Sequence, residues 1–291
     1  MNTLINTPVR TTGIRAGMPP HAAASEDRLA RLAGPALKAA AAFWYGVVAL
    51  GQLAFVVYIA GFYGRAAWQG EPERWNTVLP QGYVPGDTLG NLVLGVHLVF
   101  AFVITVGGVL QLLPPLRRVA PAFHRWNGRV YLIAAVLMSI GGLVMVWTHG
   151  AVDDVWRHLS TSLNAVLILV FAGFAVHHAR ARRLSLHRRW ALRLFLAVSG
   201  VWFFRVGLMF WIVANQGPVG FDPKTFTGPF LTFLAFAQYL LPLALLELYF
   251  RAEASTATYR RLAMAAALAV VTLAIAVGIV AAARILWLPH L

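Results

Sequence analysis

The chain has 291 residues, of which 59% are apolar and only 12% are charged, and its mean hydropathy is +0.70. This composition excludes an ordinary soluble domain and predicts a polytopic membrane protein. The net charge of +14 could indicate nucleic-acid binding, but the basic residues lie mostly in alternate loops, as membrane topology requires, so no nucleic-acid partner is expected. The absence of cysteine excludes disulfides and thiolate ligands.

The N-terminal arm, residues 1–40, is mostly polar. No apolar run follows Met1 directly, so a cleaved signal peptide is not expected. The sequence Ser25-Glu26-Asp27 is typical of a helix start, and we expect a short helix there on the membrane surface. Residues 41–291 are predicted to form a single transmembrane domain with its core at residues 89–214.

Seven apolar segments are long enough to cross a bilayer, which takes about 20 helical residues. They lie at residues 41–63, 89–113, 127–148, 159–178, 190–214, 229–250 and 262–287. The predicted fold is an all-α bundle of seven transmembrane helices, in which the second to fifth spans form a repeated four-helix core. The first and last spans are almost wholly apolar, and we expect no chemistry from them.

Lys and Arg are distributed unequally between the two ends of these spans. Eighteen lie in the N-terminal arm and near the loops after the second, fourth and sixth spans; the opposite side has only Arg65, Arg74, Arg157, Lys224 and Arg284. Because positively charged loops stay in the cytoplasm, we predict an N-terminus inside and a C-terminus outside. The predicted location is the bacterial inner membrane.

Two ionisable side chains lie deep within predicted spans, where a charge is costly. Arg205 lies in the outer half of the fifth span, and an arginine at a helix centre costs roughly 2.5–3.5 kcal/mol to insert. It could meet a bound anion, reach headgroup phosphates, or pair with an outer-loop carboxylate of Asp87, Asp153, Asp154 or Asp222. His97 lies about 6 Å outward of the middle of the second span, either as a neutral structural histidine or as a functional group.

The stretch from His97 to Arg205 contains one arrangement of histidines twice. His124 follows His97 after 27 residues, and His187 follows His158 after 29. In a bundle of alternating spans, His124 and His187 begin parallel helices at the inner side, and His97 and His158 lie on another parallel pair. Two neutral imidazoles from neighbouring helices can ligate a b-type haem. All four histidines are therefore candidate haem ligands, with Arg205 beside an anionic group such as a propionate.

Depth favours the inner pair of histidines. Axial ligands must sit at one level, yet the depths of His97 and His158 differ by about 10 Å. His124 and His187 are level with each other, although both lie near water. The inner pair is the better haem hypothesis.

A second constellation lies in the loop after the third span. His149, Asp153, Asp154 and His158 have spacings that suit zinc or copper if this loop is helical. Short polar loops often contain such residues by chance, so the metal hypothesis stays open.

An ordered set of residues carries a family resemblance. The set is His97 with Gly108 and Gln111, His124-Arg125 with Gly128-Arg129 and Tyr131, His187-Arg188 with Trp190 and Arg193, and Arg205. On this pattern the chain resembles a family of bacterial polytopic membrane proteins defined as a domain of unknown function, which implies a four-helix core. It departs from the family at Ala191, where methionine is usual, and at His158, which the family pattern does not contain. The alternating histidines also show a weaker similarity to two-haem transmembrane b-type cytochromes.

Three functional hypotheses follow. The first is a haem-binding electron carrier or redox sensor that works with a redox partner. The second is a haem-free small-molecule or proton-coupled transporter, in which His97 titrates and Arg205 binds an anionic substrate. The third is an accessory or scaffold subunit. The sequence has no hydrolase or transferase motif.

Overall fold

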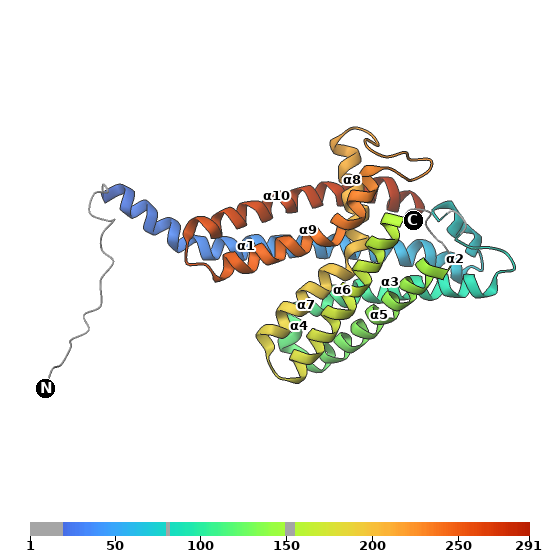
Figure 1. The fold of residues 1–291 in the computed structure, drawn as a ribbon, viewed down its shortest axis with the longest axis horizontal. Helices are drawn as coiled ribbons and strands as arrows, with labels where there is room; N and C mark the ends of the chain where they lie inside the picture. The colour runs from blue at the N-terminus through green and yellow to red at the C-terminus, as the bar shows by residue number, and fades with distance from the viewer. Residues whose placement is uncertain (1–19, 80–81, 149–154) are drawn as a thin grey trace.

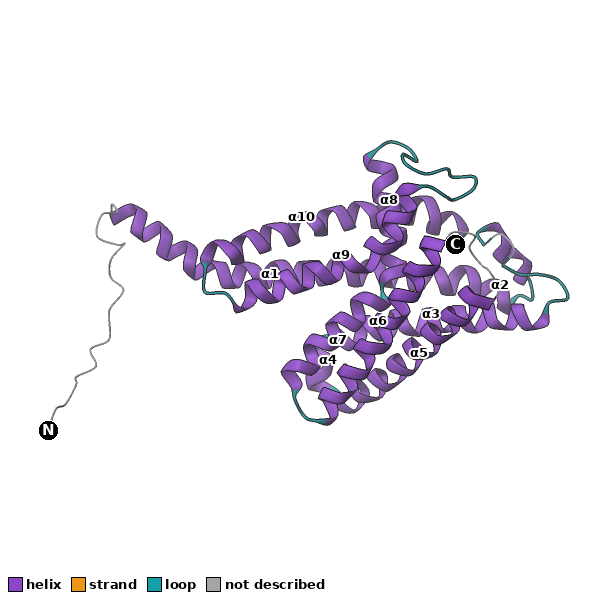
Figure 2. Cartoon of the chain, viewed as in Figure 1, coloured by secondary structure: helices purple, strands orange, loops and turns teal. Residues whose placement is uncertain are grey.

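The structure is a computed structural model and describes residues 20–79, 82–148 and 155–291. These residues form helices joined by loops and turns, which confirms the predicted all-α fold (Figures 1 and 2). The main helices are α1 (Pro20–Tyr58), α3 (Thr88–Leu112), α5 (Pro121–Thr148), α6 (Val155–Arg180), α7 (Leu184–Val198), α8 (Gly200–Ala214), α9 (Pro229–Ala254) and α10 (Thr258–Ala282). Shorter helical elements are η1 (Ile59–Gly64), α2 (Arg65–Trp68), η2 (Pro72–Thr77), α4 (Pro114–Val119), η3 (Ala283–Trp287) and η4 (Leu288–His290).

The seven predicted spans correspond to six long apolar helical segments and one bent pair. Six segments within the described residues are long and apolar enough to cross a membrane, and α7 and α8 together make the seventh. These two helices meet at an angle of 55°, with the break at Ser199. The fifth span is therefore one apolar run in the sequence but two helices in the structure.

The helix of the first span begins earlier than expected. α1 runs without interruption from Pro20 to Tyr58, so the prediction of a separate short surface helix at Ser25 is wrong. Alanine favours helix more than any other residue, and runs of alanine on both sides of the internal Pro35 keep the helix continuous. Much of the predicted N-terminal arm thus extends the first span.

The helices form two groups (Figure 1). One group is α3, α5, α6 and α7, in which each helix packs on the next; it contains the second to fourth predicted spans and only the first half of the fifth, so the predicted core at residues 89–214 extends too far. The other contains α1, α9 and α10, with α1 lying along α10. α8 packs on α9 and α10, so the break at Ser199 takes the chain from the first group to the second.

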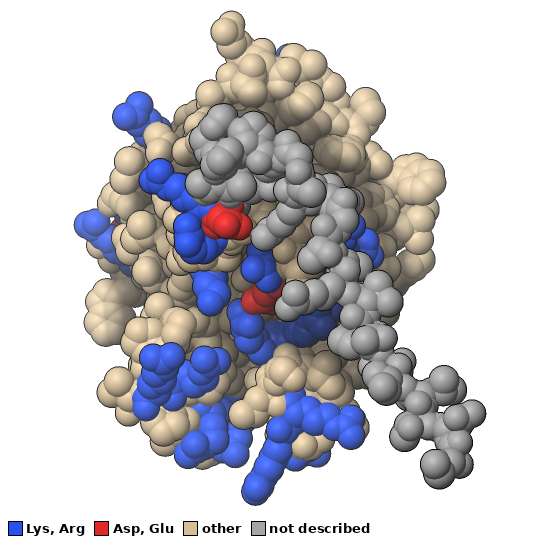
Figure 3. Space-filling view, turned by 90° about the vertical axis from the view of Figure 1, so that its left-hand side faces the viewer, with Lys and Arg blue, Asp and Glu red and all other residues tan. Residues whose placement is uncertain are grey.

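The two ends of the molecule differ in charge. Lys and Arg gather at the end where α1 begins (Figure 3), which we call the basic end. The opposite end contains η1, α2 and the C-terminus (Figure 1). This separation fits the positive-inside pattern, and the orientation in a membrane stays a prediction.

Glycine allows close contact between α8 and α10. A Cβ atom added to Gly278 of α10 would collide with the backbone oxygen of Val206 in α8. Small residues permit such backbone contact between membrane helices. The second helix group therefore holds α8 against α10 through backbone atoms.

Candidate functional site

Arg205 lies on α8, six residues beyond the break at Ser199. One Nη1 hydrogen is donated to the carbonyl of Val201 at 3.2 Å, and the guanidinium carbon lies 5.5 Å from the centre of the Phe55 ring. The side chain therefore stays beside its own helix turn and does not reach along α8 towards Ala214, as snorkelling would require. No carboxylate of the described residues forms an ion pair with Arg205.

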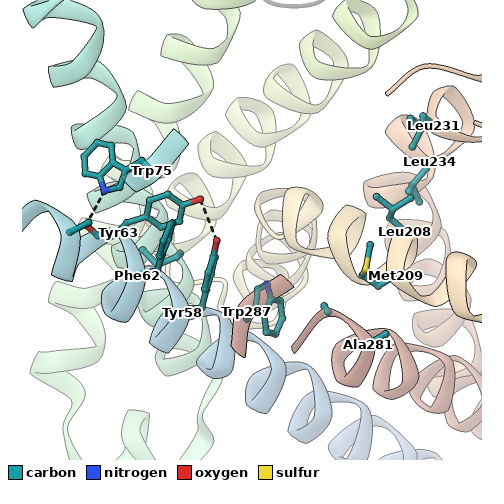
Figure 4. Close-up of a cluster of buried hydrophobic side chains, with 13 residues drawn as sticks. Tyr58, Phe62, Tyr63, Trp75, Leu208, Met209, Leu231, Leu234, Ala281 and Trp287 are labelled. Atoms are coloured by element: carbon teal, nitrogen blue, oxygen red, sulfur yellow. Dashed lines mark hydrogen bonds between the residues drawn. The ribbon is translucent and has the colours of Figure 1, made fainter. Parts of the chain in front are cut away.

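Two tyrosine hydroxyls converge near this guanidinium. Tyr58 ends α1 and Tyr63 lies in the π-helical η1, and their hydroxyl oxygens are 3.4 Å apart (Figure 4). Both side chains are buried, at 4% and 7% exposure, and both interact electrostatically with Arg205. Trp75 donates its indole N–H to the carbonyl of Tyr63 at 3.1 Å, which ties the following loop to η1. We call Tyr58, Tyr63 and Arg205 the arginine–tyrosine cluster.

His97 borders this cluster from α3. It is accessible at the surface of the helix bundle and lies within electrostatic range of Arg205. Two of the carboxylates expected near Arg205 have other partners: Asp87 accepts from the backbone N–H of Gly90, and Asp222 from that of Lys224. Asp153 and Asp154 lie outside the described residues.

The first span, from which no chemistry was expected, contributes polar side chains to this region. Besides Tyr58, α1 contributes Gln52, whose Nε2 donates to the hydroxyl of Ser199 at 2.9 Å. Asn164 of α6 donates to the carbonyl of Ala197, which lies in α7 two residues before the break, at 3.3 Å. The side-chain oxygens of Gln52 and Asn164 are buried and have no hydrogen-bond donor among the described residues. The break is therefore surrounded by polar groups within an apolar bundle.

A chain of amides leads to His124 at the basic end. Asn127 Nδ2 donates to the carbonyl of Gly107 at 2.9 Å and to Gln111 Oε1 at 2.8 Å. Because Gln111 Oε1 accepts, its Nε2 faces His124 Nε2 as a donor at 3.3 Å. The His124 proton is thereby placed on Nδ1, which is buried and without a partner in the described part of the chain.

His187 has the opposite arrangement. Its Nδ1 donates to the backbone carbonyl of Ala175 at 2.9 Å, so a neutral ring has its lone pair on Nε2. His187 interacts electrostatically with His124 and with His178, which the sequence did not single out. The ring of His177 lies 5.1 Å from that of His178, so the predicted inner pair belongs to a cluster of four histidines at the basic end.

The two histidines of the predicted outer pair lie in different environments. His97 lies beside Arg205, whereas the ring of His158 lies 6.1 Å from that of Trp147 in α5. For the metal hypothesis, His149, Asp153 and Asp154 fall outside the described residues. Within the described residues, no group of three or more His, Asp or Glu is arranged to hold a metal ion.

An ion pair absent from the sequence hypotheses joins α7 to α9. Arg193 Nε and Nη2 both lie 2.7 Å from Glu247 Oε1, and the Arg193 guanidinium also covers Trp190, 4.5 Å from the ring centre. The two charges thus pair with each other near the basic end. Glu247 is therefore the ion-pair partner of Arg193 and not of Arg205.

Comparison with known proteins identifies one match. The family model described as "Predicted membrane protein (DUF2306)" matches residues 94–241, which run from α3 into α9. This range contains the break, Arg205 and the histidine cluster at the basic end. No curated protein and no solved structure matches the chain.

Proposed function

The chain belongs to the family described as predicted membrane protein (DUF2306), and from the surroundings of Arg205 we propose that it binds a small organic anion and moves it across the bilayer. Arg205 is the observation that carries this proposal. A guanidinium has five N–H donors, and among the described residues Arg205 has one hydrogen bond, to Val201. Two phenolic hydroxyls lie in its surroundings, and no carboxylate of the described residues pairs with it.

The break at Ser199 supports movement as well as binding. Discontinuous membrane helices form the substrate sites of many transporters, because polar groups at the break can face a ligand. Here the break separates α7 and α8 by 55° and connects the two helix groups. A change in that angle would move Arg205 relative to the four-helix core.

His97 adds a group that can exchange a proton. Histidine changes its charge near neutral pH more readily than any other side chain. An anion that arrives at Arg205 would favour a protonated His97 by charge attraction, because the two side chains lie within electrostatic range. This would couple anion binding to proton uptake.

Arg205→Gln is expected to abolish anion uptake. Glutamine keeps two N–H donors but has no charge to hold an anion at membrane depth. Proteoliposomes would be tested at neutral pH for uptake of radiolabelled succinate, a short dicarboxylate, and of octanesulfonate, a permanently charged anion with a long alkyl chain. Arg284→Gln, at the same end of the molecule, is the control. Equal uptake by wild type and Arg205→Gln of both probes would reject the proposal.

A second candidate function, haem binding at the basic end, is favoured by one observation. The His187 Nδ1–H bond to Ala175 leaves Nε2 free, which is how protein histidines are oriented for a metal. His124, close by, would have to exchange its hydrogen bond from Gln111 for the iron. A haem held there would supply one-electron chemistry.

Haem binding predicts a Soret band that depends on His187. Protein purified from haem-replete cells would show this absorption, and His187→Ala would lose most of it, because the ring with the free Nε2 is removed. His290→Ala, at the opposite end of the molecule, is the matched histidine control. A wild-type spectrum without a Soret band rejects haem binding. A protein that lacks both haem and anion uptake would favour the accessory-subunit hypothesis.

A further inference from the structure

An apolar cavity lies next to the arginine–tyrosine cluster. It has a volume of about 340 Å³ and lies between η1, α2 and Trp75 on one side and α3 on the other. Its lining includes Ile59, Gly95, Leu98 and Phe102, and it is almost wholly apolar. The volume lies within the range of small-molecule sites, about 300–1,000 Å³.

Tyr63 links the cavity to the charged group. Its side chain lines the cavity, and its hydroxyl lies beside that of Tyr58 (Figure 4). Both hydroxyls are within electrostatic range of Arg205, so Tyr63 is the member of the arginine–tyrosine cluster that connects the cavity wall to the guanidinium. The cavity offers apolar surface of a kind that binds methylene groups, each worth about 0.8 kcal/mol when buried.

We propose that the anion bound by this protein is a single-chain amphiphile of the fatty-acid type, with its carboxylate at Arg205 and Tyr63 and its alkyl chain in the cavity. This inference rests on the proposed function and names its substrate class. The positive charge of Arg205 favours an anionic head group, because Arg205 has no carboxylate partner among the described residues. The apolar lining favours a ligand with an alkyl chain, because a short polar anion would leave the cavity unfilled.

Gly95 allows the two parts of the site to be tested separately. It lines the cavity, and a Cβ atom added there would meet no heavy atom within 4 Å. Gly95→Leu should therefore fill the cavity without disturbing the helix contacts of α3. Gly141→Leu is the matched control, since Gly141 lies on α5 and also has nothing within 4 Å.

The experiment measures thermal stabilisation of the purified protein in neutral detergent by butyrate, octanoate and dodecanoate, below their micellar concentrations. We expect the midpoint shift to rise with chain length in wild type and in Gly141→Leu. In Gly95→Leu the response to butyrate should persist and the increase with chain length should disappear. In Arg205→Gln the response to all three acids should be lost, and dodecanol should stabilise none of the variants comparably.

The outcomes separate this inference from the proposed function. If no acid stabilises the protein through Arg205, anion binding itself fails. If the stabilisation depends on Arg205 but is the same for all three acids, or still rises with chain length in Gly95→Leu, the anion is bound without an alkyl-chain site and the inference is overturned. Equal stabilisation by dodecanol would assign the site to a neutral amphiphile. Complete competition by phosphatidylglycerol would assign it to a phospholipid, and either result overturns the inference.

Discussion

Gly278→Ala is expected to destabilise the protein by about 1–3 kcal/mol, the usual cost of overpacking a well-packed contact. The added methyl group would collide with the backbone oxygen of Val206. It would also lie only 2.8 Å from the Cγ1 atom of the Val206 side chain. A backbone oxygen cannot rotate away as a side chain can, so α8 and α10 must separate. The loss should appear as a lower midpoint of thermal unfolding.

Gly173→Ala is the control for this prediction. Gly173 lies within α6, and an added Cβ atom would meet nothing within 4 Å, so the higher helix propensity of alanine should leave stability unchanged or slightly raise it. Equal midpoints for the two variants would show that α8 and α10 are not in backbone contact.

Gln52→Leu is expected to lower anion uptake without lowering the stability of the protein. The Gln52 side chain is 2% exposed, and its Oε1 has no donor among the described residues, so an apolar residue of similar volume removes a buried polar cost. The Ser199 hydroxyl can turn to a carbonyl of its own helix. We expect an unfolding midpoint equal to or above that of wild type.

Anion uptake by Gln52→Leu should nevertheless fall roughly tenfold, because residues at hinges often control the rates of conformational steps. The bond from Gln52 to Ser199 is a direct link between α1 and the break. Octanesulfonate uptake by proteoliposomes measures the effect, with Gln69→Leu in an exposed loop as the control. Undiminished uptake would show that this bond has no part in transport.

The spans could be predicted from the sequence, but the break could not be read from hydropathy alone. Residues 190–214 are mostly apolar along their whole length, and they contain no proline. Ser199-Gly200 was the available signal, since adjacent Ser and Gly are common at helix kinks. The hydrogen bonds at the bend come from Gln52 and Asn164, which lie in distant parts of the chain, so they appear only in the folded structure.

The candidate site was predictable in part. The cost of a buried charge identified Arg205, and the alternating direction of the spans placed His124 and His187 at the same end, where they interact. The tautomer of His124 depends on Gln111 and Asn127 from two helices, so only the folded contacts define it. Tyr58 and Tyr63 could not be found, because residues five apart do not face each other on an α-helix.

The π-helical turn of η1 has a consequence for how the site is encoded. On an α-helix, Tyr58 and Tyr63 would point about 140° apart, at 3.6 residues per turn. The wider turn of a π-helix, with its i to i+5 spacing, brings them to one face. An α-helical turn of the same length would send the two hydroxyls to different sides, whereas deleting one residue would leave the tyrosines four apart, which an α-helix also places on one face. The arginine–tyrosine cluster is thus specified by the π-helical turn of η1 as well as by the identities of its residues.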